Sequence, residues 1–245
     1  ENLLLRVLEL NAVPSSELMT IVFTSGSTAV PKGVMLSFGN IAANLRQVDH
    51  VVHWTDDDVL VGVLPFFHSF GATVTLWAPL TRAIKAVYHT NPLEAQVVGR
   101  LTREHRGTVL VSTPMFMRAY VRRCEPADFA SLSFVGAGGE KLPPELARAF
   151  AEKFGIAPVE GYGATEMAPL VSANAPASRG RTDYADWHKE GTVGRPVPGV
   201  LTRVVDPATG AELPPGEQGL LLLTGPNRML GYLDDPEATA AVVSD

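Results

Sequence analysis

The sequence has 245 residues, which is enough for one large domain or two small ones. Hydrophobic residues make up 46% of it and charged residues 19%, values that are typical of a globular protein and argue against intrinsic disorder. The net charge of −6 leaves no basic excess for a nucleic-acid backbone, so we predict no nucleic-acid partner, although local lysines and backbone N–H groups can still bind a small anion.

The single cysteine, Cys124, rules out a disulfide within the chain, and we interpret it as structural. No apolar stretch reaches the roughly 18–20 residues that cross a bilayer, and the N-terminus lacks the pattern of a signal peptide. We therefore predict a cytoplasmic location, with peripheral association with the inner membrane, through parts outside this sequence, as the alternative. The sequence begins at Glu1 without an initiator methionine, which suggests a fragment.

Apolar stretches typical of strands alternate with amphipathic stretches typical of helices. In chain order we predict strand 19–23, helix 37–52, strand 59–64, helix 70–77, strand 83–88, helix 92–105, strand 108–112, helix 114–123, strand 132–135 and helix 144–154. Helix 70–77 is expected to stop before Pro79. This order predicts an α/β fold with a mostly parallel sheet flanked by helices, because nearly all-apolar strands require cover on both faces.

The pattern changes after about residue 170. Residues 172–190 are polar and irregular, which indicates an exposed loop. Two further strands are predicted at 200–206 and 219–224, joined by a turn that contains Pro214, Pro215 and Gly216. We therefore predict a division into an α/β part, residues 1–170, and a loop with a smaller β-rich subdomain, residues 171–245.

The first motif with chemical content is TSGSTAVPKG at residues 24–33. Small residues let backbone N–H groups approach an anion closely, hydroxyls add donors, and Lys32 supplies a point charge for phosphate. The order Pro-Lys-Gly differs from the Walker pattern, which needs Gly-Lys before Ser or Thr. A flexible surface turn is the alternative.

The second motif is EGYGATE at residues 160–166. Its glycines, Gly161 and Gly163, would let a planar ligand lie close to the backbone, and Tyr162 can stack on such a ligand. Glu166 is a hard oxygen ligand suited to Mg²⁺. A tight turn without function is the alternative.

Two further motifs follow strands. The glycine cluster of GAGGEKL at 136–142 would expose the edge of the backbone to a nucleotide base. A simple connection between a strand and a helix is the alternative. LPFFHSFG at 64–71 places aromatic residues around His68, and a histidine in such surroundings is more often structural than catalytic.

Together these motifs resemble the adenylate-forming superfamily of acyl-CoA synthetases, acyl-carrier-protein synthetases, peptide-synthetase adenylation domains and luciferases. The first resembles its phosphate loop TSGSTG-x-PKG and the second its G-Y-G-x-T-E signature. GTVGRP at 191–196 and GPNRMLGY at 225–232 resemble later elements in the same order. The resemblance covers nearly the whole chain from about residue 20 and implies the α/β fold of the superfamily's large N-terminal domain.

The resemblance also implies roles for individual residues. The phosphates would be held by Thr24, Ser25, Gly26, Ser27, Thr28 and Lys32. Adenine would be held by Tyr162, Gly163 and the backbone at Gly138, Gly139 and Glu140. Catalytic roles would fall to Lys32, His68, Thr165 and Glu166, with His68 near the acyl carboxylate, Thr165 at the α-phosphate and Glu166 on Mg²⁺.

The implied reaction is ATP-dependent activation of a carboxylate to an acyl-adenylate with release of pyrophosphate, followed by transfer to the thiol of CoA or of a carrier-protein phosphopantetheine. Amino-acid-activating relatives generally pair the substrate ammonium with a carboxylate near the histidine motif, but residues 59–93 contain no Asp or Glu. Phe66, Phe67, Phe70 and Trp77 favour an apolar tail instead. We therefore predict a fatty acid or another hydrophobic acid without an amine.

The closest resemblance within the superfamily is to the synthetase part of bifunctional acylglycerophosphoethanolamine acyltransferase/acyl-carrier-protein synthetases, carried by residues 64–71, 136–142 and 160–176. One departure is Ala29, where the phosphate loop usually has glycine. The ribose-binding aspartate, the C-terminal lid domain and the first part of the usual N-terminal domain are not found in the sequence. A binding fragment without turnover, an amino-acid adenylation domain and a luciferase-like oxygenase stay as alternatives, whereas a Rossmann dehydrogenase lacks its G-x-G-x-x-G after the first strand.

Overall fold

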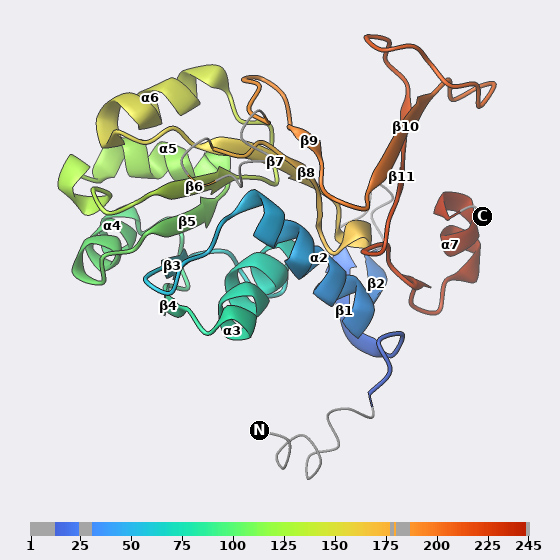
Figure 1. Ribbon diagram of the computed structural model, residues 1–245, viewed down its shortest axis with the longest axis horizontal. Coiled ribbons are helices and arrows are strands. Elements are labelled where there is room, and N and C mark those ends of the chain that lie inside the picture. Colours follow the sequence, from blue (N-terminus) through green and yellow to red (C-terminus); the bar gives the residue numbers. More distant parts are fainter. Residues whose placement is uncertain (1–12, 25–30, 177–178, 180–186, 244–245) are drawn as a thin grey trace.

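A seven-stranded sheet forms the centre of the protein in the computed structural model, which describes residues 13–24, 31–176, 179 and 187–243 (Figure 1). Its strand order is β4-β3-β5-β6-β7-β8-β9, with parallel pairing from β4 to β7 and antiparallel pairing of β7 with β8 and of β8 with β9. The mostly parallel sheet confirms the predicted α/β fold. The strands are β3 (Val59–Gly62), β4 (Lys85–Tyr88), β5 (Val109–Ser112), β6 (Phe134–Ala137), β7 (Val159–Gly163), β8 (Leu170–Ala173) and β9 (Arg195–Pro196).

Helices cover both faces of this sheet (Figure 1). One face carries α4 (Ala95–Glu104), α5 (Pro114–Arg123) and α6 (Pro144–Phe154), and the other carries α2 (Phe38–Val51) and α3 (Ala78–Arg82). The limits of α5 and α6 agree with the prediction, and α6 ends at Gly155 in the left-handed conformation that glycine favours. Buried side chains of the strands and of α2, α5 and α6 form one continuous core.

A three-stranded antiparallel sheet lies beside the main sheet, with the order β1 (Leu18–Thr24), β2 (Lys32–Ser37) and β12 (Gly231–Tyr232). The sequence analysis predicted a strand at 19–23 and a helix at 37–52 around the motif at 24–33, and the structure adds the strand β2, which was not predicted, between them. Pairing with β1 on one side and with β12 on the other stabilises β2, and the second partner is almost two hundred residues away.

The helix predicted at 70–77 does not stop before Pro79. It is a π-helix (Gly71–Trp77) that continues directly into α3, so Pro79 lies inside a continuous helical run, and the carbonyl of Thr75, four residues before it, accepts from the Tyr88 hydroxyl instead of a backbone N–H. The wide turn is visible in the bond from the N–H of Ala78 to the carbonyl of Thr73, five residues earlier.

The segment 172–190 is only partly the exposed loop that we predicted, since Ser172 and Asn174 are buried where β8 pairs with β7 and β9. Asn174 accepts a hydrogen bond from the N–H of Lys189 and donates to the carbonyl of Thr192, which ties this segment together. Strands on both sides of residue 170 therefore share the large sheet, and the division at that residue stays a prediction.

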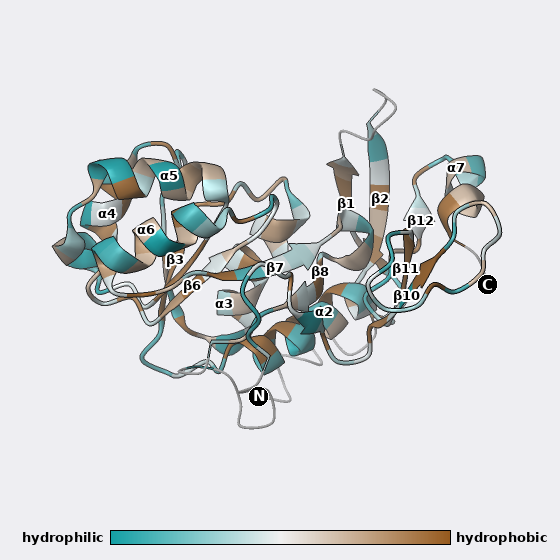
Figure 2. Ribbon diagram, turned by 90° about the horizontal axis from the view of Figure 1, so that it is seen from above, coloured by the Kyte–Doolittle hydropathy of each residue, from teal (hydrophilic) through white to brown (hydrophobic). Residues whose placement is uncertain are grey.

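The remaining elements lie at the C-terminal end. The predicted strands are present as β10 (Leu201–Val205) and β11 (Leu220–Thr224), which pair with each other in a separate two-stranded sheet, and α7 (Pro236–Val242) follows β12. Two 3₁₀ turns lie elsewhere, at Pro126–Asp128 and Thr165–Met167. Figure 2 shows hydrophobic residues along β10 and β11, and Leu201, Leu220, Leu221 and Leu222 are exposed, so this ribbon adds little to the main core.

The N-terminus of α2 is fixed by a reciprocal cap. The Ser37 hydroxyl accepts from the N–H of Asn40 at 3.1 Å, and the Asn40 side chain accepts from the N–H of Ser37 at 2.9 Å. We expect Ser37→Ala to lower the free energy of unfolding by about 1 kcal/mol. Urea denaturation measures this change, with Ser16→Ala at an exposed position as the control. Equal midpoints for the two variants would contradict the capping role.

Candidate active site

A pocket of about 410 Å³ opens at the carboxyl ends of the parallel strands β3, β5, β6 and β7. In open α/β sheets this edge is where ligands bind, because loops from several strands meet there. The pocket is lined by the segment after β3, by the start of α5, by the loop after β6 and by the end of β7. Four segments that are far apart in the sequence therefore form one concave surface.

Seven of the fourteen residues predicted from the sequence to bind substrate line this pocket, although their roles stay predictions. They come from three of the four motifs: His68, Gly138, Gly139, Glu140, Tyr162, Gly163 and Thr165. Among the described residues that line the pocket, His68 is the only basic side chain, so charge compensation for phosphate must come from its surroundings.

Ser69 is a polar residue of the pocket that the sequence analysis missed. Its buried hydroxyl lies 3.1 Å from the hydroxyl of Thr165, within hydrogen-bond distance. The contact joins the histidine segment to the turn that follows β7. It also restricts the rotation of the Thr165 side chain. The motif at 64–71 contains a hydroxyl at this position, but its partner, Thr165, lies 96 residues further along the chain and is brought near only by the tertiary structure.

The glycines of the pocket are needed for the packing of the protein itself, in addition to leaving the pocket open. A Cβ atom on Gly163 would lie 2.5 Å from the carbonyl oxygen of Pro169, which is backbone and cannot move aside. A Cβ on Gly138 would lie 2.9 Å from the ring of Phe70. The buried carboxylate of Glu160 accepts from the N–H of Leu142 at 3.0 Å and so holds the glycine-rich loop against β7.

Tyr232 contacts both Lys32 and Glu166 and so brings the first and second motifs together. The Lys32 Nζ lies 4.9 Å from the centre of the Tyr232 ring, and the Tyr232 hydroxyl donates to Oε1 of Glu166 at 2.8 Å. Thr24 pairs with Lys32 across β1 and β2. The strand ends that flank the first motif therefore converge with the second motif, whereas Ser25, Gly26, Ser27, Thr28 and Ala29 lie outside the described residues.

The Tyr232 hydroxyl keeps its proton at neutral pH. Burial of the side chain, together with its hydrogen bond to the negative charge of Glu166, raises the pKa of Tyr232 to about 12. The hydroxyl is consequently a donor, and the second oxygen of Glu166 stays available for another ligand.

The described residues contain no group of three or more His, Cys, Asp or Glu side chains that could hold a metal ion by themselves. Mg²⁺ is commonly bound through one or two carboxylates together with phosphate oxygens of a substrate. Glu166 fits that mode, because it is a half-buried carboxylate held by Tyr232 beside a lysine and next to the pocket.

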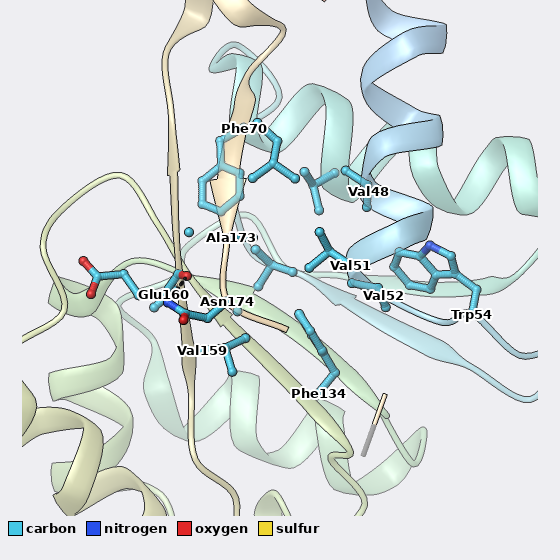
Figure 3. A pocket seen from close by; sticks show the side chains of 16 residues that line it. Val48, Val51, Val52, Trp54, Phe70, Phe134, Val159, Glu160, Ala173 and Asn174 are labelled. Carbon is cyan, nitrogen blue, oxygen red and sulfur yellow. Dashed lines mark hydrogen bonds between the residues drawn. The ribbon is translucent and has the colours of Figure 1, made fainter. Parts of the chain in front are cut away.

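A second, smaller cavity lies beside the first, and Figure 3 shows the side chains that surround it. Its lining is mostly apolar and includes Val48, Val51, Val52, Trp54, Val111, Phe134 and Val159. Phe70, Val74, Ala137, Gly161 and Leu170 line both cavities, so the two spaces are neighbours that share part of their walls. We call the two spaces the outer and the inner pocket.

Of the four aromatic residues predicted to contact an apolar tail, only Phe70 lines either pocket. Phe66 packs edge-on against Tyr88, and Phe67 is 72% exposed. Trp77 packs against the core around β1 and β2. These three residues therefore line neither pocket, and only Phe70 of the four lies where it could contact a tail in these two spaces.

Cys124 is buried, and its thiol donates to the carbonyl of Ala95 at 3.1 Å. Burial raises the pKa of the Cys124 thiol to about 12, so a thiolate does not form at neutral pH. A structural role, as predicted, agrees with this environment.

Comparison with known proteins identifies the class. The family described as AMP-binding enzyme matches residues 6–233, and the chain belongs to this family. It is 31% identical over 235 residues to a long-chain-fatty-acid–CoA ligase of Escherichia coli and 33% identical over 227 residues to a feruloyl-CoA synthase of Amycolatopsis, covering 94% and 92% of this chain. The chain spans only 40% and 44% of those relatives.

A solved structure, ATP-bound MatB from Rhodopseudomonas palustris, has a TM-score of 0.80 and 30% identity, and covers 95% of this chain and 44% of its own. The chain is therefore homologous to acid–thiol ligases of the adenylate-forming superfamily. Across the described residues, the helices are too short or too polar to span a bilayer.

Proposed function

We propose that this chain forms the ATP-binding and acyl-binding part of an enzyme that activates a fatty acid, or a similar hydrophobic acid, as its acyl-adenylate. The observation that carries the proposal is the convergence of His68, Thr165 and the Tyr162 ring in one pocket, with Lys32 and Glu166 beside it. The family membership supports ATP as the co-substrate.

In the proposed first step an oxygen of the substrate carboxylate attacks the α-phosphorus of ATP, and the bond to pyrophosphate breaks as the new P–O bond forms. The residues contribute positioning and charge compensation rather than covalent chemistry. Thr165, oriented by Ser69, would donate to the α-phosphate, and Lys32 would bind the outgoing phosphates. Mg²⁺, held by Glu166 and phosphate oxygens, would supply further charge compensation.

In the proposed second step a thiol sulfur attacks the acyl carbon and AMP leaves. The names of the relatives favour CoA as the thiol, and a carrier-protein phosphopantetheine is the alternative acceptor. Supplying each thiol in turn after the adenylate has formed distinguishes the two.

The inner pocket supports a hydrophobic substrate without an amine. Its only carboxylate, among the described residues, is Glu160, which is engaged by the N–H of Leu142 and points away from the apolar side chains (Figure 3). An ammonium group buried there would lack a counter-charge, which is costly. The outer pocket would hold the nucleotide and the reacting carboxylate, and the inner pocket would receive the end of the tail.

The test is ATP–pyrophosphate exchange by the natural polypeptide and by this chain alone, with palmitate, ferulate and amino acids as acids. We expect exchange with palmitate in the natural polypeptide. Exchange with amino acids alone would contradict the proposed substrate class. ATP binding without exchange in both proteins would favour the alternative, a nucleotide-binding fragment without turnover.

Phe70 is expected to limit the acyl chain, because it is the largest of the residues that line both the outer and the inner pocket. Phe70→Ala would join the two cavities and raise the exchange rate with long chains relative to short chains by roughly fivefold. Competition between palmitate and octanoate measures the ratio. Phe66→Ala removes a ring of the same size outside both pockets and is the control. A ratio that changes equally in both variants would contradict the role of Phe70.

A further inference from the structure

The segment Met229–Leu233 contacts both sides of the proposed ATP site, yet the proposed reaction gives it no role. On one side it binds the residue proposed for Mg²⁺: the N–H of Met229 donates to the backbone oxygen of Glu166 at 2.7 Å, and the Tyr232 hydroxyl donates to its carboxylate at 2.8 Å. Both the backbone and the side chain of Glu166 are thus held by this one segment.

On the other side the same segment is hydrogen-bonded to β2, which begins at Lys32. The N–H of Leu233 donates to the carbonyl of Gly33 at 2.7 Å, and the N–H of Leu230 donates to the carbonyl of Met35 at 2.9 Å. Because β12 is the third strand of that sheet, the position of Tyr232 relative to Lys32 is set by backbone pairing.

Tyr232 separates two opposite charges. The ammonium of Lys32 lies over the face of the ring, while the carboxylate of Glu166 accepts from the hydroxyl at the ring's edge. No direct ion pair joins Lys32 to Glu166 in the described part of the chain. A direct pair would neutralise both groups before a nucleotide arrived, whereas the ring holds the lysine more weakly and leaves it available.

We propose that Tyr232 is a positioning residue that presents Lys32 to the phosphates and Glu166 to the divalent cation of the bound nucleotide, and that it keeps these two charged groups from pairing with each other. The inference rests on the proposed function of the site. It adds a role for Tyr232, which in the proposed reaction contacts neither the attacking carboxylate oxygen nor the α-phosphorus.

The structure allows the hydroxyl and the ring to be tested separately. Tyr232 is only 7% exposed and packs with apolar residues of β1 and β2, so Tyr232→Phe keeps the packing and the ring under Lys32 while it removes the bond to Glu166. Tyr232→Leu removes the ring face as well. Tyr88→Phe is the matched control, because it removes a hydrogen bond of the same length, 2.8 Å, to the carbonyl of Thr75 outside the site.

The experiment is calorimetric titration of the natural polypeptide with α,β-methylene-ATP over a range of Mg²⁺ concentrations. For Tyr232→Phe we expect the Mg²⁺ concentration at half-maximal nucleotide binding to rise about three- to tenfold, with metal-free binding changed less than about twofold. For Tyr232→Leu we expect metal-free binding to weaken as well, by about fivefold, because Lys32 becomes free to pair with Glu166. Tyr88→Phe should leave both quantities unchanged.

If Tyr232→Phe leaves the Mg²⁺ dependence unchanged, or weakens metal-free binding by the same factor, the positioning role is wrong and the hydroxyl is merely structural. If the unaltered protein fails to bind the nucleotide at any Mg²⁺ concentration, the proposed function itself fails. Nucleotide binding by the unaltered protein therefore distinguishes a failure of the proposed function from a failure of the positioning role.

Discussion

Replacing Glu166 by glutamine is expected to lower ATP–pyrophosphate exchange at least tenfold at limiting Mg²⁺. The amide has the same shape and its oxygen can still accept from Tyr232, and the N–H of Met229 still bonds to the backbone oxygen of residue 166. Only the negative charge is lost, and a neutral amide oxygen is a poorer ligand for Mg²⁺ than a carboxylate. A tenfold loss corresponds to about 1.4 kcal/mol of binding.

The measurement is an exchange assay on the natural polypeptide over a series of Mg²⁺ concentrations, because the defect should shrink as Mg²⁺ approaches saturation. Glu152→Gln makes the same chemical change on the exposed side of α6 and is the control. Unchanged exchange by Glu166→Gln at limiting Mg²⁺ would remove Glu166 from the site.

The helices and central strands could be predicted because their signals are local. Pro114 and Pro144 each open a helix, and Gly155 closes one, so α5 and α6 have the predicted limits. The strand β2 was missed because its first residues, Lys32 and Gly33, belong to the glycine-containing motif, and because one of its two partner strands, β12, lies almost two hundred residues away. The end of β7 resembled a glycine turn because Gly161 and Gly163 weaken a strand signal, although they allow close approach of the backbone of β8.

The candidate site could be predicted as a set of motifs but not as an arrangement. His68, Gly138 and Tyr162 follow or end different parallel strands, and the general rule for such sheets places them at one edge, as found. Ser69 and Tyr232 could not be assigned a role from sequence, because each acts through a partner that only the tertiary structure brings near. A run of aromatic residues likewise does not say which ring faces a pocket, and of Phe66, Phe67, Phe70 and Trp77 only Phe70 does.

A buried ion pair fixes the segment after β8 to the opposite end of the main sheet. Arg179 donates two hydrogen bonds to the carboxylate of Asp58, at 2.7 and 2.8 Å, and the carboxylate also accepts from the hydroxyl of Thr108 and the N–H of Thr55. Only 1% of the Asp58 side chain and 11% of the Arg179 side chain are exposed. Burial by itself would raise the pKa of Asp58, but the hydrogen bonds from Arg179, Thr108 and Thr55 outweigh it and lower that pKa.

Asp58→Asn is therefore expected to lower the free energy of unfolding by about 3 kcal/mol at neutral pH, because it leaves the buried Arg179 charge without its partner. Since the pKa of Asp58 is lower in the folded than in the unfolded protein, its stabilising effect is full above the unfolded value, about 3.9, and is lost as the pH falls through the folded value. Urea denaturation at pH 7 and at successively lower pH should show the difference between Asp58→Asn and the unaltered protein shrinking only below about pH 4. Glu212→Gln disrupts an exposed pair with Arg203 and should change stability by less than about 1 kcal/mol at every pH. A difference as small for Asp58→Asn as for Glu212→Gln would mean that Arg179 finds other partners and that the pair does not hold this segment.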